Sequence, residues 1–172
     1  AFGTIDPDNN SPRVQNWNVT VERQIGKSWQ ASASYLGSYA DRLWGALQVN
    51  PGQFLGLGPC TINGVAYPTC TTAANLNNRR TLILENPALG QYYGAVDVHS
   101  DVGSQAYRGL KLSFQRRAGT GVSLNGNYTI SHCEGDTESG FSFAQFSAGY
   151  LDPKNPSFDR GNCSQNRTHI AN

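Results

Sequence analysis

Length, composition and charge restrict what this chain can be. Its 172 residues are 38% hydrophobic and 15% charged, fractions that are low for a well-filled soluble core. Its 13 Lys and Arg residues and 12 Asp and Glu residues give a formal net charge of +1. The protein therefore has no long-range electrostatic field that would attract nucleic acid or anionic surfaces. No apolar run of about 18 residues occurs, which excludes a transmembrane helix but not membrane strands of about 10 residues with one apolar face.

The first predicted element is a β-hairpin over residues 13–49. From Val14 the side chains alternate, and a period of two indicates a strand. Gly26-Lys27-Ser28 then reverses the chain, and a second alternating strand runs from Trp29 toward Val49. On the first strand, one face carries Gln15, Trp17, Val19, Val21, Arg23 and Ile25, and the other carries Asn16, Asn18, Thr20 and Glu22.

A second hairpin is predicted over residues 107–132, with its turn at Ala118-Gly119-Thr120-Gly121. Its apolar positions are Leu110, Leu112, Phe114, Val122, Leu124, Gly126, Tyr128 and Ile130. The alternate positions are mostly small, uncharged and polar, and the apolar faces begin or end in Trp or Tyr. Aromatic ends are typical of strands that meet lipid headgroups. A soluble sheet with one wet face remains the alternative on pattern alone.

Two long segments separate these hairpins, 50–106 and 133–166. Loops of this length are uncommon in compact domains, whereas outer-membrane barrels combine short periplasmic turns with long external loops. The chain starts at Ala1 without Met, and residues 167–172 look like the start of a next strand. The whole of 1–172 is therefore expected to be a partial barrel: all-β, an antiparallel meander of about 4–5 strands from a transmembrane β-barrel, with long external loops.

All four cysteines lie in the long segments. Closing a loop of about 15 residues stabilises a fold by roughly 3 kcal/mol in the chain-entropy model. Among the three possible connectivities, local pairing of Cys60 with Cys70 and of Cys133 with Cys163 is favoured. A zinc site is disfavoured because only His132 beside Cys133 offers a ligand pair. The cysteines thus indicate an oxidising compartment outside the cytoplasm.

Short strings run in order along nearly the whole chain. They are Asp6-Pro7, Ser11-Pro12-Arg13-Val14-Gln15-Asn16-Trp17-Asn18, Ala33-Ser34-Tyr35-Leu36-Gly37-Ser38, Asn78-Arg79-Arg80, Asn86-Pro87, Gly90-Gln91-Tyr92-Tyr93-Gly94, Tyr107-Arg108-Gly109-Leu110, Asn127-Tyr128-Thr129-Ile130-Ser131-His132-Cys133 and Asp159-Arg160-Gly161-Asn162-Cys163. Together they resemble the barrel region of TonB-dependent receptor-like outer-membrane proteins of the acidobacterial, Oar-like type, which carry a carboxypeptidase-regulatory-like front domain.

This resemblance implies a bacterial outer-membrane barrel with extracellular loops that imports a bulky nutrient, is powered through TonB and is gated by a plug. The chain departs from the family because it shows no plug, no TonB-contacting segment and no front domain. About five strands cannot close a pore, since the smallest single-chain barrels use eight. The expected partners are the remaining strands and plug of a parent chain, or copies of itself, together with outer-membrane lipid; TonB would be reached only through the missing parts.

Candidate sites are few. Asp6, Asp8 and Asn10 echo a calcium loop, but Ser11 and Trp17 stand where a Gly and a Glu are needed. The acidic group Glu134, Asp136 and Glu138 is more typical of a solvated loop. No nucleophile or phosphate-binding motif occurs, so neither an enzyme nor a cofactor is expected. Loop aromatics could stack on a ligand or pack the loops together: Tyr92, Tyr93, Phe141, Phe143, Phe146 and Tyr150.

Two functions follow as hypotheses. In the first, the chain supplies wall and external loops to a TonB-dependent-type uptake barrel, and transports nothing by itself. In the second, it is a released β-fragment whose strand edges pair with copies of itself, or with a partner, in an extracellular filament or complex.

Overall fold

The computed structural model describes residues 2–117, 121–136, 150, 152 and 155–172. The chain divides into a sheet unit and a loop unit. The sheet unit comprises Asn10–Trp44, Asp101–Phe141 and Pro156–Asn172, and the loop unit comprises Ala1–Asn9, Gly45–Ser100 and Ser142–Asn155. Two long strands, β3 (Trp29–Gln48) and β6 (Val96–Arg116), contribute residues to both.

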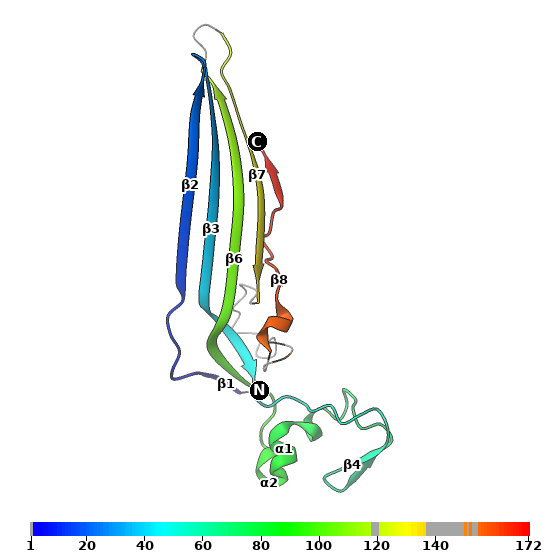
Figure 1. The fold of residues 1–172 in the computed structure, drawn as a ribbon. Coiled ribbons are helices and arrows are strands. Elements are labelled where there is room, and N and C mark those ends of the chain that lie inside the picture. Colours follow the sequence, from blue (N-terminus) through cyan, green and yellow to red (C-terminus); the bar gives the residue numbers. More distant parts are fainter. Residues whose placement is uncertain (1, 118–120, 137–149, 151, 153–154) are drawn as a thin grey trace. The chain divides into compact units, whose positions relative to one another are not determined.

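In the sheet unit, β2 (Arg13–Ile25), β3, β6 and β7 (Leu124–Gly135) lie side by side (Figure 1). The short strands β8 (Gly161–Asn162) and β9 (His169–Ala171) both pair with β7 in antiparallel fashion. Pairing between β2 and β3 and between β6 and β7 is antiparallel as well. The structure therefore confirms the predicted antiparallel sheet, and the chain is mostly β, with short helices in the loop unit.

The turn between β2 and β3 sets the register of the first hairpin. Gly26 has a φ of +62°, in the left-handed region that glycine adopts at no steric cost. From this turn, pairing continues without interruption from Ile25 opposite Trp29 to Arg13 opposite Asp41. Directly opposite residues of two strands share a face, so the apolar residues of β2 and β3 lie on the same side of the sheet.

β6 begins at Val96, inside the segment for which the sequence predicts a loop up to residue 106. Its first residues pair in parallel with β1 (Phe2–Ile5), and the Val49 N–H donates to the Val96 carbonyl oxygen. Asp97 is disfavoured in strands, so the local pattern gives little sign of a strand here. The hydrogen bonds of this part of β6 come from segments distant in sequence, so the local pattern predicts a loop where the structure has a strand.

The loop unit has small elements of its own. These are the hairpin of β4 (Cys60–Ile62) and β5 (Val65–Tyr67), the 3-10 turn η1 (Asn77–Arg79), and the helices α1 (Thr81–Glu85) and α2 (Pro87–Gly90). Asn86 caps α2, because its side-chain oxygen accepts a hydrogen bond from the Leu89 N–H, and Pro87 takes the first helical position. In the sheet unit, a further 3-10 turn, η2 (Pro156–Asp159), precedes β8.

Apolar side chains are rarely buried in this fold. Among the described residues the buried hydrophobic positions are Ile62, Cys70, Cys133 and Tyr150, whereas several buried residues are polar or charged. The described part of the sheet is thus one layer, and the hydrophobic side chains of its strands stay at the surface.

Candidate functional site

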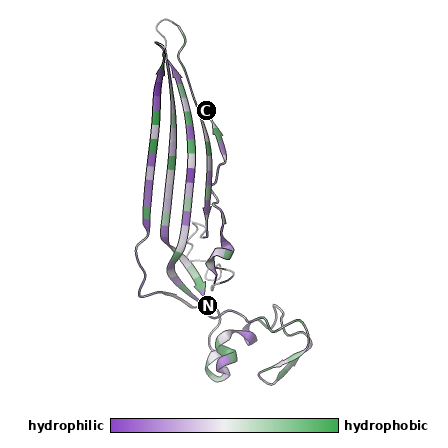
Figure 2. Cartoon of the chain, in the orientation of Figure 1, coloured by the Kyte–Doolittle hydropathy of each residue, from purple (hydrophilic) through white to green (hydrophobic). Residues whose placement is uncertain are grey.

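The most extensive functional feature is the uncovered apolar face of the sheet. Hydrophobic and hydrophilic residues alternate along its strands (Figure 2). Val19 is 62% exposed and Val21 is 68% exposed. The other exposed members of this face are Trp17, Ile25, Trp29, Tyr35, Tyr39, Leu110, Leu112, Phe114, Leu124, Tyr128 and Ile130. Exposed apolar patches of this extent are typical of surfaces that meet another protein or a membrane.

The opposite face of the same strands is polar. The Thr20 hydroxyl donates a hydrogen bond of 2.9 Å to the Ser34 hydroxyl oxygen, across β2 and β3. Its other residues include Asn16, Asn18, Ser32, Ser38, Lys111, Ser113, Asn125, Asn127 and Thr129. A sheet with one apolar and one hydrated face matches the wall of a membrane barrel, whose strands alternate in this way.

The sheet is open along β2. All 13 residues of this strand are exposed, and among the described residues β2 pairs on one side alone, with β3. A strand edge presents a row of unpaired N–H and C=O groups, which hydrocarbon does not satisfy. In a membrane this edge therefore requires another strand.

Ion pairs gather at the end of the sheet away from the Gly26 turn. Arg13 pairs with Asp41, and the Arg160 guanidinium lies 2.9 Å from a carboxylate oxygen of Glu134. The hydrogen bond from Arg160 lowers the pKa of Glu134 below its usual value. Beside this pair, the Asp136 carboxylate accepts hydrogen bonds from the Ser104 N–H and hydroxyl, at 2.6 and 2.7 Å.

Both cysteine pairs are bonded as the local pairing predicts, Cys60 with Cys70 and Cys133 with Cys163. The second bridge joins the end of β7 to the segment after β8. It is reinforced by the Cys163 N–H, which donates to the Cys133 carbonyl oxygen, and by the Asn166 side chain, which accepts from the Cys133 N–H at 2.9 Å. These contacts anchor the segment that follows β8 to the sheet.

Buried polar side chains hold the loop unit together. Asn50 is completely buried; its amide nitrogen donates to the Gly94 carbonyl oxygen at 2.7 Å and its oxygen accepts from the Leu82 N–H at 2.9 Å. Arg80 donates to the Asn50 carbonyl oxygen at 2.7 Å. Arg79 donates to the side chain of Asn75 and to backbone carbonyl oxygens nearby. The two arginines thus hold the backbone of the loop unit in place. The Asn78-Arg79-Arg80 string was the only feature of the sequence that drew attention to these two residues.

Asp97 is the most unusual ionisable group of the loop unit. It is 1% exposed, and one carboxylate oxygen accepts from the Gln48 side chain at 2.8 Å. Its other oxygen has no hydrogen-bond partner among the described residues. Burial raises the pKa of Asp97 above its usual value, against the opposing charges of His99 and Arg80. The protonated carboxyl is therefore favoured here more than in water.

The candidate ligand-contacting aromatics differ in exposure. Tyr92 is 72% exposed and remains a candidate. Tyr93 is 48% exposed and also remains a candidate; its ring lies 5.7 Å from that of Phe2. Tyr150 is buried. Burial of Tyr150 fits packing within the loop unit better than contact with a ligand. Phe141, Phe143 and Phe146 lie outside the described residues.

The acidic groups considered for calcium have protein partners. The Asp6 carboxylate accepts from the Asp8 N–H and from the Ser100 hydroxyl, both at 3.0 Å. Glu134 is engaged by Arg160, and Glu138 lies outside the described residues. Within the described part of the chain, no group of three or more His, Cys, Asp or Glu side chains is placed to hold a metal ion.

Comparison with known proteins gives the class. The described residues include no helix that is long and apolar enough to span a membrane. The family described as Outer membrane beta barrel domain matches residues 1–172. No curated protein and no solved structure gave a significant match. The chain belongs to the outer membrane beta barrel domain family, and its location is the bacterial outer membrane.

Proposed function

We propose that this chain forms wall strands and external loops of a TonB-dependent-type uptake barrel. The observation that carries the proposal is the sheet unit itself, one layer with an uncovered apolar face, a polar face and an open β2 edge. The strings along the chain resemble TonB-dependent receptors and support the finer assignment. The segment is structural in this proposal and has no catalytic role.

The remaining strands, the plug and the TonB-contacting segment belong in this proposal to the same polypeptide. The test is the mass and peptide map of the protein purified from outer membranes with antibodies against residues 1–172. We expect one polypeptide with additional strands and an N-terminal plug. A mature protein that consists of these residues alone, folded as a monomer without detergent, would contradict the proposal.

The orientation of the loops has its own test. Short turns of bacterial barrels face the periplasm and longer loops face outside. We expect a membrane-impermeant maleimide to label Tyr92→Cys on intact cells, and to label Lys27→Cys, in the Gly26 turn, only after the outer membrane is permeabilised. The reverse pattern would show that the loop unit faces the periplasm.

A second candidate function is favoured by the exposed β2 edge. A released fragment could pair this edge with a copy of itself or a partner strand and form an extracellular filament or complex. Electron microscopy of the purified protein separates the two functions, because the barrel predicts single pore-sized particles and the second candidate predicts a repeating polymer.

A further inference from the structure

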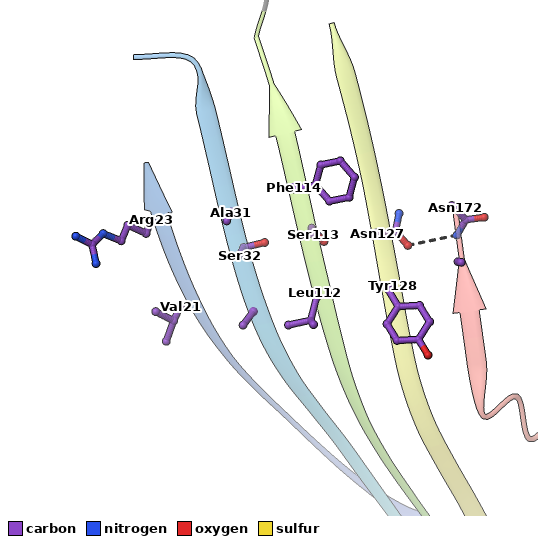
Figure 3. A pocket seen from close by; sticks show the side chains of 12 residues that line it. Val21, Arg23, Ala31, Ser32, Leu112, Ser113, Phe114, Asn127, Tyr128 and Asn172 are labelled. Carbon is purple, nitrogen blue, oxygen red and sulfur yellow. Dashed lines mark hydrogen bonds between the residues drawn. The ribbon is translucent and has the colours of Figure 1, made fainter. Parts of the chain in front are cut away.

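The apolar face of the sheet unit contains an open hollow of about 720 Å³ (Figure 3). On β3 it is lined by Ala31 and Ala33, and bulkier side chains of the neighbouring strands flank these two small residues. Those bulkier residues are Val21 on β2, Leu112 and Phe114 on β6, and Tyr128 on β7. The two alanines lower the surface on β3, and the lining residues reach from β2 across β3 and β6 to β7 and β9, so the hollow is a groove that crosses the strands. A groove with apolar walls suits a hydrocarbon chain.

The side of this hollow nearest the Gly26 turn carries two arginines without a salt-bridge partner among the described residues. Arg23 lies opposite Ala31 and lines the hollow. The Arg116 guanidinium lies 5.7 Å from the centre of the Trp29 ring, beside the Gly26 turn. Among the described residues, no carboxylate forms a salt bridge with either arginine. At the other end of the sheet, Arg13 and Arg160 are neutralised by acidic partners.

We propose that this groove binds one anionic phospholipid. Its acyl chain lies over Ala31 and Ala33, between the bulkier side chains of the neighbouring strands, and its phosphate is held by Arg23 and Arg116 on the side of the Gly26 turn. Guanidinium groups match phosphate oxygens in geometry and charge, and Trp29 is the kind of side chain that sits at headgroup depth. The chain's net charge of +1 does not oppose this, because the two arginines act locally. The inference rests on the proposed function, since it requires this face to meet lipid.

The test is native mass spectrometry of the full chain, folded in detergent with phosphatidylglycerol or phosphatidylethanolamine. We expect one tightly retained phosphatidylglycerol and weaker retention of phosphatidylethanolamine. Arg23→Gln and Arg116→Gln should each reduce the retained lipid roughly fivefold, the usual effect of one basic residue at an anionic surface. Arg108→Gln is the matched control, because Arg108 is exposed on the same face of β6 toward the opposite end.

The apolar part of the groove is tested separately. Ala33→Phe should fill it and reduce lipid retention with both arginines in place, whereas Val19→Phe introduces the same phenylalanine ring on β2 outside the lining residues and should not reduce it. Equal retention by all variants, or an equal loss in Arg108→Gln, would overturn the inference. Either result would leave the barrel proposal standing if the protein still required detergent. A protein that stays soluble and monomeric without detergent would overturn both.

Discussion

Asn50 shows how a single uncharged side chain can organise a loop. Replacing it with Ala leaves the half-buried Leu82 N–H and Gly94 carbonyl oxygen without their partner, at up to about 1–3 kcal/mol for each group. We expect Asn50→Ala to increase hydrogen exchange and proteolysis across residues 80–95. Asn78→Ala is the control, because Asn78 donates to the Tyr67 hydroxyl at an exposed position. Equal protection in the two variants would show that Asn50 does not hold the loop.

The Glu134–Arg160 pair predicts a pH dependence. The folded-state pKa of Glu134 is lowered, so the ion pair stabilises the folded state fully above the unfolded-state pKa near 4.5. This stabilisation is lost as the pH falls through the folded-state pKa. We expect proteolysis around residues 160–166 to rise below pH 4.5 and Glu134→Gln to remove this pH step. Glu22→Gln removes a carboxylate elsewhere on the sheet and should keep the step. Persistence of the step in Glu134→Gln would contradict the assignment.

At the scale of elements, the contact between Trp17 and Gly37 fixes how β2 lies against β3. A Cβ atom at Gly37 would overlap the Trp17 indole ring, so Gly37→Val forces the ring away. We expect Gly37→Val to lower the free energy of unfolding by about 1–3 kcal/mol, the usual cost of overpacking. The measurement is the unfolding temperature in detergent, which should fall. Trp17→Ala combined with Gly37→Val should recover part of it, and Ala40→Val, on the opposite face of β3, should cost less. Unchanged stability of Gly37→Val would refute this contact.

The elements that the sequence predicts are those with a local signal. Strict alternation and the Gly26 turn indicate β2 and most of β3, and the second hairpin follows for the same reason. The first residues of β6 were missed because their pairing with β1 is parallel and distant in sequence. Helix α2 was missed although Asn86 and Pro87 are a helix start signal, because four residues are too few to show a helical period.

The candidate site divides in the same way. The apolar face could be predicted because its residues recur at every second position of a strand. The groove could not, because it depends on which residues of β2, β3, β6 and β7 become neighbours. The polar framework around Asn50 could not be predicted either, because a loop amide belongs to no periodic pattern and its partners are mostly backbone groups.

For the whole molecule, the decisive property is the difference in environment between adjacent residues of β2. The full chain is placed in lipid vesicles with a bimane fluorophore on single cysteines, at Asn18, Val19, Thr20 and Val21 in turn. We expect nitroxide groups on lipid acyl chains to quench the fluorophore at Val19 and Val21, and aqueous iodide to quench it at Asn18 and Thr20. If the lipid-borne quencher reaches none of the four positions, or reaches all of them equally, the sheet is not the wall of a membrane barrel.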